Sequence, residues 1–172
     1  MPYTLEEISS RLEITDIYAR YVHAADARDF DTLDHIFLPE TIFDWTSCGG
    51  GKMSYTEAKA GPVFQGKLFP WSYHIYANPQ IDCLDGGERA RVLVKAVNPS
   101  GLPQGGNGAS GSGSGKPVMF QTHGTYTDDL VKTEAGWRIV NRYWDEAFIT
   151  GPFEKVEGIP GMLGLAGVKM DG

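Results

Sequence analysis

The chain has 172 residues, 41% of them hydrophobic, and a formal net charge of −7 at pH 7. This length allows one domain with its own core and a pocket. The acidic charge and the lack of a Lys/Arg cluster argue against a nucleic-acid partner. The apolar runs are too short to span a membrane, and residues 1–7 lack the apolar stretch of a signal peptide. We therefore expect a cytoplasmic protein without a membrane partner.

The N-terminal part of the chain has the pattern of an amphipathic helix. Thr4 and Glu7 have the spacing of a capping box, which would begin this helix. Its expected apolar face consists of Leu5, Ile8, Leu12, Ile14, Ile17, Tyr18, Tyr21 and Ala25. Tyr21 and Asp26 would be about 140° apart on a regular helix at roughly 100° per residue. For both side chains to reach one substrate, the helix must end or become irregular near Asp26, and we expect this.

A second, short helix is predicted next. Asp29 or Asp31 would cap it, it would run through Phe37, and Pro39 would stop it. A strand is predicted at residues 41–46, where the sequence is rich in β-branched and aromatic side chains.

The remaining core is predicted to be mainly β, after one more capped helix start at Ser54. The expected strands are residues 73–84, 90–98, 118–131 and 137–148, joined in pairs by turns at 85–88 and 134–136. Helices on one face of a curved antiparallel sheet form an α+β cone. Such a cone-shaped barrel leaves an apolar cavity between the sheet and the first helices.

Two segments lie outside the predicted core at about residues 5–148. Residues 99–116 contain seven glycines but join two predicted strands, which indicates a long hairpin loop within a single domain, 1–172. The loop is either a tolerated surface insertion or a lid or subunit contact. The tail at 149–172 carries apolar residues that a neighbouring subunit or the cavity could cover.

Tyr21, Asp26 and His74 are the candidate catalytic residues. A carboxylate can hold an imidazole in one tautomer, and the imidazole can then move a proton near neutral pH. A nearby phenol can polarise a carbonyl group. Each residue also has a structural alternative: Asp26 as the cap of a turn, His74 as a core histidine and Tyr21 as packing on the helix face.

The chain resembles the nuclear transport factor 2-like superfamily and, within it, the SnoaL-like group. The resemblance covers about residues 5–148 and is carried by Ile17-Tyr18-Ala19-Arg20-Tyr21 running into Asp26, by Phe30-Asp31-Thr32-Leu33 and by Gly136-Trp137-Arg138-Ile139. The group includes scytalone dehydratase, bile acid 7α-dehydratase, hexachlorocyclohexane dehydrochlorinase and polyketide cyclases. The resemblance implies the cone fold and a small-molecule substrate.

The resemblance also implies roles for individual residues. Asp26 and His74 match the helix carboxylate and catalytic histidine of the dehydratases and the dehydrochlorinase. Tyr21 matches a catalytic tyrosine of the bile acid dehydratase and stands at the lysine position of the dehydrochlorinase. Arg142 falls where the dehydrochlorinase has a functional arginine, and Trp45 lies near a pocket tyrosine of scytalone dehydratase. The second histidine of scytalone dehydratase and the second aspartate of the bile acid enzyme have no clear match.

Substrate binding is predicted for five further side chains. They are Phe43, Trp45, Tyr126, Arg142 and Trp144, and the aromatic members would suit a ring-shaped ligand. Strand alternation places Arg142 on one face with Val140 and Trp144, which would point it inward. Alternatively, Arg142 pairs with Asp145 or Glu146 at the surface.

The interpretation that follows is a cofactor-independent lyase, of dehydratase type, or an isomerase. Its substrate would be an apolar, oxygenated cyclic compound, and the protein is expected to be a homo-oligomer, either a dimer or a trimer. No metal site is expected, because the histidines form no paired motif, and there is no phosphate-binding glycine motif. Two alternatives remain: a binding module without chemistry, and a structural small subunit of an aromatic-ring dioxygenase.

Overall fold

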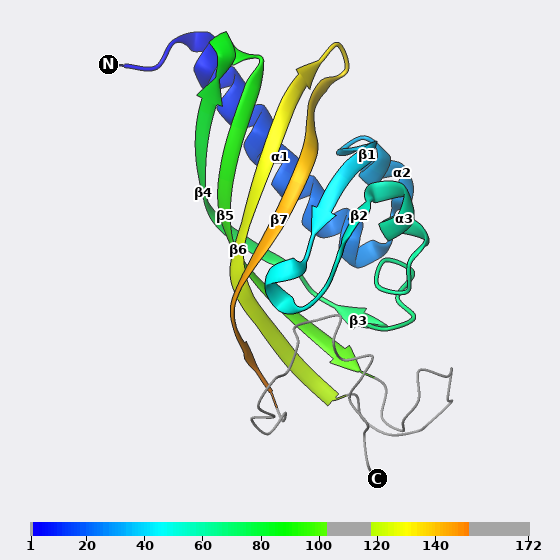
Figure 1. The fold of residues 1–172 in the computed structure, drawn as a ribbon. Helices are drawn as coiled ribbons and strands as arrows, with labels where there is room; N and C mark the ends of the chain where they lie inside the picture. The colour runs from blue at the N-terminus through cyan, green and yellow to red at the C-terminus, as the bar shows by residue number, and fades with distance from the viewer. Residues whose placement is uncertain (1, 103–117, 152–172) are drawn as a thin grey trace.

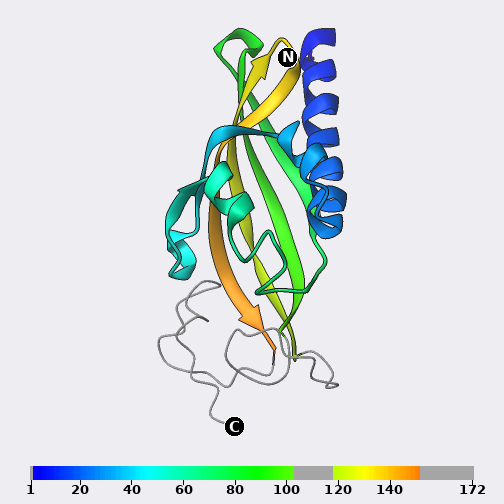
Figure 2. The ribbon, with the colours of Figure 1, turned by 90° about the vertical axis from the view of Figure 1, so that its right-hand side faces the viewer.

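A long helix lying against a strongly curved sheet makes up most of the structure (Figures 1 and 2), a computed structural model that describes residues 2–102 and 118–151. The helices are α1 (Leu5–Ala27), α2 (Phe30–Asp34), η1 (Thr46–Cys48), α3 (Tyr55–Ala60) and η2 (Asp85–Gly87). The strands are β1 (Phe37–Asp44), β2 (Lys52–Ser54), β3 (Trp71–Ser72), β4 (Ile75–Leu84), β5 (Arg89–Leu102), β6 (Val118–Thr133) and β7 (Gly136–Thr150).

The seven strands form one sheet in the order β2-β1-β7-β6-β5-β3, and β4 also pairs with β5. All strand pairs are antiparallel except β1 with β7, which is parallel. The α+β class and the placement of α1 on one face of a curved sheet confirm the predicted architecture (Figure 2). Within the described residues, no helix is long and apolar enough to cross a membrane.

Helix α1 begins at the predicted capping box, because Thr4 Oγ1 accepts from the Glu7 N–H and the Glu7 carboxylate accepts from the Thr4 N–H. The predicted apolar face is wrong in its first turns, since Leu5, Ile8 and Leu12 are 86%, 42% and 66% exposed. At about 100° per residue these three side chains lie on the opposite side of the helix from the buried face. That buried face consists of Ser10, Ile14, Ile17, Tyr18, Tyr21 and Ala24.

The second helix is shorter than predicted. Asp29 caps it by accepting from the Thr32 N–H, and it ends at Asp34. Phe37 belongs to β1, and Pro39 lies within that strand instead of stopping the helix. The pairing of β1 with β7 shifts register between Phe37 and Ile42. A proline in a strand is tolerated at such an irregularity, because it has no N–H to donate to the ladder.

The long strands extend further than their predicted ends. Leu102 of β5 pairs with Val118 of β6, so residues 99–102 are strand and not part of the predicted glycine-rich loop. The rest of that loop, 103–117, and the tail from 152 lie outside the described residues. Strand β7 continues to Thr150, slightly beyond the predicted core boundary.

The main core lies between α1 and the sheet. It joins the buried face of α1 to side chains from α2, β1 and the long strands, among them Leu33, Phe37, Val92, Leu130 and Ile139. A second, smaller cluster consists of Phe69, Leu102 and Phe120, with Val63, Leu68 and Ile149 packed against it. This second cluster lies toward the end of the sheet where β3 pairs with β5.

Replacing residues 103–117 by an Asn-Gly turn should leave the fold intact. The ladder is already closed by the Leu102–Val118 pair, and the cost of closing a loop changes slowly with its length. We expect an unchanged far-UV circular dichroism spectrum and an equal or slightly higher melting temperature. A Gly-Ser segment of the original length is the matched control. Loss of cooperative unfolding in the shortened protein alone would show that this segment is a packing element.

Candidate active site

Asp26 and His74 form a close pair that joins the end of α1 to the edge of the sheet. His74 Nδ1 lies 2.6 Å from Asp26 Oδ1, and the His74 backbone N–H donates to Asp26 Oδ2 at 3.0 Å. The two side chains are 18% and 22% exposed, so both are shielded from much of the solvent. One carboxylate therefore fixes both the backbone and the ring of His74.

His74 lies in a short interruption between two strands that both pair with β5. Residues 73–84 were expected to form one strand, but β3 ends at Ser72 and β4 begins only at Ile75. Opposite the gap lies Pro99, whose carbonyl accepts from the Tyr73 N–H at 2.9 Å. Proline has no N–H to return to the ladder, which weakens strand pairing at this point. Because the Tyr73 N–H faces β5, the N–H of His74, the next residue, faces away from β5 and donates to the Asp26 side chain.

The end of helix α1 positions Asp26. The helix finishes at Ala27, as expected, and Arg28 follows in the left-handed region at φ 56°. The Arg28 N–H donates to the carbonyls of Ala24 and Ala25, which closes the last turn. Asp26 does not line the cavity, and its place is beside the His74 ring. The helix therefore needs no distortion for Asp26 to act on the site.

A cavity of about 70 Å³ lies between α1, the sheet and the segment that precedes β3. A single water needs roughly 10–15 Å³ measured in this way, so the space is larger than a hydration site. The cavity is lined by Tyr21, Ala25, Arg28, Phe30, Leu33, Trp45, Val63, Phe64, Phe69, Ser72, His74, Asn98, Ser100 and Tyr126. Most of this lining is apolar, and its polar groups come mainly from the sheet.

Tyr21 and His74 share this cavity. Their rings meet edge to face with centroids 5.9 Å apart, and Tyr76 lies 5.3 Å from the Tyr21 ring on another side. Tyr21 is buried, and the neighbouring aromatic rings leave it little freedom to move. The structure thus brings together the three side chains that the sequence nominated as catalytic, two in the cavity and Asp26 behind His74.

The predicted aromatic lining divides into two layers. Trp45 and Tyr126 line the cavity, whereas Phe43 and Trp144 are not among its lining residues. Phe43 packs behind Trp45 with ring centroids 5.3 Å apart, and Trp144 packs behind Tyr126 at 4.6 Å. Direct substrate contact is therefore not supported for Phe43 and Trp144, which instead hold the lining rings in place.

Arg142 does not line this cavity either, although it points inward as one alternative predicted. It forms a two-point ion pair with Asp128, at 3.0 Å from Nε and 2.7 Å from Nη2. The Tyr18 hydroxyl donates to the same carboxylate at 2.9 Å. The guanidinium carbon also lies 4.2 Å from the centre of the Tyr21 ring and 4.7 Å from that of Tyr126. Arg142 thus supports the cavity from behind.

Electrostatics keep this buried ion pair charged. Burial alone would lower the pKa of Arg142, but Asp128 and the surrounding tyrosines outweigh burial and hold that pKa well above its usual value. Burial, with the negative charge of Asp128, raises the pKa of Tyr18, so this phenol stays protonated and donates. The alternative surface pairs of Arg142 with Asp145 or Glu146 are absent among the described residues.

Arg142 and Trp144 are both buried, as strand alternation predicted, whereas Val140 is only partly buried, and a shift in strand register explains the difference. The β6–β7 pairing shifts between Asp129 and Leu130, so that Ile139 and Arg142 are both buried although an odd number of positions separates them. Val140 lies between them and is only partly buried. An extra residue in one strand changes which face the following side chains occupy.

Asn98 and Ser100 line the cavity, and sequence reasoning missed both. They alternate on one face of β5, and Asn98 lies directly across from Thr122 on β6. Asn98 Nδ2 is 3.4 Å from Thr122 Oγ1, whereas Asn98 Oδ1 is buried without a hydrogen-bond partner in the part of the chain that the structure describes. Alternation along a longer β5 could have found them, but Ser100 fell in the predicted loop.

The described residues contain no group of three or more His, Cys, Asp or Glu side chains arranged to hold a metal ion.

The comparisons with known proteins fit this geometry. A model of the SnoaL-like domain matches residues 6–143. The chain belongs to the SnoaL-like family. An uncharacterized protein of Mycobacterium tuberculosis is 31% identical over 145 residues, which cover 84% of this SnoaL-like chain and 90% of that protein.

Two solved structures show the same fold. The hexachlorocyclohexane dehydrochlorinase LinA-type3 from Novosphingobium barchaimii LL02 has a TM-score of 0.69 at 14% identity, over 91% of this SnoaL-like chain and 98% of its own. A nuclear transport factor 2-like superfamily protein from Salmonella enterica has a TM-score of 0.62 at 22% identity, over 87% and 96%. These likenesses confirm the predicted cone fold of the SnoaL-like protein.

Removing Asp128 should destabilise the SnoaL-like protein strongly. Asp128→Ala leaves the buried Arg142 charge unpaired, and breaking a buried pair in this way costs about 3–5 kcal/mol. The double variant Asp128→Leu with Arg142→Met removes both charges and should regain much of that loss. Urea unfolding of the two variants measures the difference. A loss below about 1 kcal/mol for Asp128→Ala, typical of an exposed pair, would contradict this account.

Proposed function

We propose that the SnoaL-like protein is a cofactor-independent lyase or isomerase, with its active site in the cavity that His74 lines. The observation that carries the proposal is the two-point contact between Asp26 and His74 at the edge of that cavity. A carboxylate held against Nδ1 is the arrangement that makes the other ring nitrogen of a histidine an effective base.

His74 is the general base in this proposal. A neutral imidazole that faces a carboxylate through Nδ1 carries its hydrogen there, which leaves a lone pair on Nε2. Nε2 then removes a proton from carbon next to a substrate carbonyl group. As His74 becomes positively charged, Asp26 stabilises that cation at 2.6 Å. Asp26 is therefore a positioning residue that acts through His74.

Tyr21 and Asn98 are placed to handle the substrate oxygens. The Tyr21 phenol would donate a hydrogen bond to the oxygen on which negative charge develops, and such a fixed donor accelerates proton abstraction. Asn98 Oδ1 is buried, has no partner among the described residues and would accept from a substrate hydroxyl group. In a lyase, His74 then gives the proton that it took from carbon to the departing hydroxyl group, which leaves as water; in an isomerase, His74 returns the proton to another carbon.

The substrate is proposed to be a compact ring compound that carries oxygen substituents. Trp45, Tyr126 and Phe64 give the cavity flat apolar walls, which suit a ring. The structural neighbour named above is a hexachlorocyclohexane dehydrochlorinase, and its substrate name agrees with chemistry on a ring. The assembly into a dimer or trimer and the cytoplasmic location remain parts of the proposal.

The two non-catalytic alternatives fit the geometry less well. A structural small subunit gives no reason for a contact between Asp26 and His74, yet His74 Nδ1 lies 2.6 Å from Asp26 Oδ1. A binding module would tolerate an exposed or turned-away His74. Here the ring lines the cavity and is held by a carboxylate from behind, which supports proton transfer.

Replacing either Asp26 or His74 should abolish proton transfer without unfolding the protein. The probe is 2-tetralone in D₂O, because uptake of deuterium next to its carbonyl group reports enolisation without knowledge of the natural substrate. We expect Asp26→Asn and His74→Gln each to lower the enzyme-catalysed rate by about 100-fold or more. The double variant should lose little beyond either single one, because the two residues act as a unit.

His23→Gln is the matched control for these variants, since His23 is an exposed histidine on α1, the helix that carries Asp26. It should exchange deuterium at the wild-type rate. Catalysed exchange in His74→Gln at the wild-type rate would sink the proposed role of the pair, and so would additive losses in the double variant.

Tyr21→Phe tests whether the Tyr21 hydroxyl donates a hydrogen bond to the substrate or whether Tyr21 only packs its ring. The change keeps the ring stacked among its neighbours and removes only the hydroxyl, so the melting temperature should stay nearly the same. The rate of deuterium exchange should fall by about 100- to 1000-fold, which is the usual effect of losing one fixed donor. Tyr143→Phe, on a side chain that does not line the cavity, serves as the control. If Tyr21→Phe and Tyr143→Phe exchanged deuterium at equal rates, Tyr21 would have a packing role only.

A further inference from the structure

Arg28 gives the cavity a charge that the proposed proton transfer does not use. The residues that line the cavity include Arg28 but no Asp, Glu or Lys. Arg142 lies outside the lining and is neutralised by Asp128. Among the described residues, Arg28 is therefore the only permanently charged side chain that borders this mostly apolar space. A guanidinium in such a place is costly unless something uses its charge.

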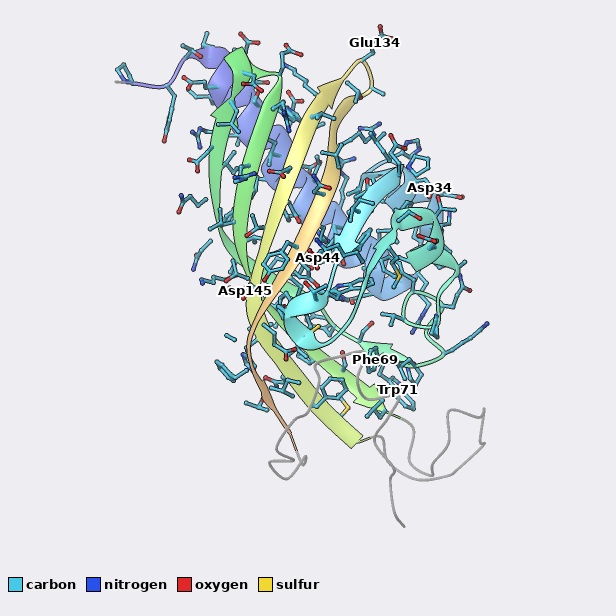
Figure 3. The ribbon with its side chains drawn as sticks, in the orientation of Figure 1. Asp34, Asp44, Phe69, Trp71, Glu134 and Asp145 are labelled. Atoms are coloured by element: carbon cyan, nitrogen blue, oxygen red, sulfur yellow. The ribbon has the colours of Figure 1, made fainter. Side chains whose placement is uncertain are left out.

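The guanidinium of Arg28 is held in a fixed position. Its Nη2 donates to the carbonyls of Phe69 and Pro70, at 3.0 Å each. These two residues end the loop that runs into β3, where Figure 3 labels Phe69 and Trp71. The side chain of Arg28 is partly buried, so it is neither a free surface cation nor sealed in the core.

Gly66 makes room for this guanidinium. A Cβ atom at Gly66 would lie 2.2 Å from Arg28 Nε and 2.3 Å from Nη2. The φ of Gly66 is +67°, a left-handed conformation that glycine adopts without strain. The loop thus passes against the guanidinium with only a backbone, which leaves the group oriented before any ligand binds.

Part of the donor capacity of Arg28 remains unused. Only Nη2 has hydrogen-bond partners within residues 2–102 and 118–151, and no carboxylate there forms an ion pair with Arg28. Nη2 has both of its hydrogens engaged and Gly66 packs against the Nε side, so Nη1 is the donor left for a ligand. A hydrogen bond from this charged group to a carboxylate oxygen is stronger than one to a neutral acceptor. A fixed cation beside a mostly apolar cavity can pair with the negative charge of an organic acid whose apolar part occupies the cavity.

We propose that the substrate carries a carboxylate group and that Arg28 binds it inside the cavity. The ligand class is then an apolar ring compound with one negative charge. This inference rests on the proposed function for the position of the reacting group, but the binding itself needs no chemistry. Arg28 sets specificity by favouring an acid over a neutral compound of the same shape.

A pair of compounds that differ only in charge tests this inference. 2-Naphthoate and 2-naphthamide have nearly the same shape, and isothermal titration calorimetry measures the affinity of each. The buffer is low in salt and at about pH 8.5, where an ordinary imidazole with a pKa of about 6.5 is neutral. We expect the wild-type protein to bind the carboxylate at least about tenfold more tightly than the amide.

Arg28→Gln removes the charge but keeps an N–H₂ group that can still donate to the two loop carbonyls. It should reduce the preference for the carboxylate to about twofold or less and leave the affinity for the amide nearly unchanged. Arg20→Gln is the matched control, because Arg20 is an exposed arginine on α1, the helix that ends just before Arg28, and is paired with Asp16. It removes the same charge from the protein and should keep the preference.

Two further variants keep the test decisive. Gly66→Ala leaves every charge in place but displaces the guanidinium, so it should also lower the preference even if Arg28→Gln does not fold. His74→Gln should lose proton transfer yet retain the preference, which separates this inference from the proposed function. Equal binding of both compounds by the wild type, or binding of neither, would overturn it. So would a preference that survives in Arg28→Gln, or one lost in Arg20→Gln or His74→Gln.

Discussion

The buried pair of Arg142 and Asp128 is the constraint on which the site depends. An unpaired charge in the core costs several kcal/mol, so β6 and β7 must keep the register that joins the two side chains. Tyr18 donates to the same carboxylate and ties α1 to the sheet. Tyr21 lies almost one turn further along that helix, against the guanidinium of Arg142. The position of the end of α1 that carries Tyr21 therefore depends on a charge pair outside the cavity.

A second constraint acts at the opposite edge of the sheet, where regular pairing fails. Pro99 has no N–H for the ladder, and the chain opposite it leaves the strand at Tyr73 and His74. An unpaired backbone N–H at a partly buried position needs another acceptor. Asp26 supplies it at 3.0 Å and with its second oxygen orients the ring. Because the His74 N–H faces away from β5, the carboxylate of Asp26 can hold both the backbone and the ring of His74.

Interactions between residues close in the sequence could be predicted from the sequence, whereas the partners of residues far apart in the chain could not. The capping boxes at Thr4 and Ser54 depend on side chains three residues apart, so the sequence predicted both helix starts. Phe37 continued a helical pattern, but pairing with β7 made it a strand residue. The partner of Arg142 depends on a register shift that no local pattern reveals. The pairing of Asp26 with a histidine 48 residues away came from family resemblance and not from spacing.

The positions of the charged groups determine where negative charge would move in the proposed reaction. Asp26 stands behind His74 and outside the lining, so before proton transfer the negative charge of the pair is shielded from the cavity. When His74 takes a proton, the pair becomes neutral and the negative charge moves to the substrate. In a low-dielectric space that charge interacts strongly with nearby donors, chiefly Tyr21 and the cation of Arg28. The net charge of −7 acts mainly at the surface, where salt screens it over about 10 Å at 0.1 M. In the proposal, the positive charge that Arg28 gives the cavity, opposite in sign to the net charge of the protein, favours a negatively charged ligand.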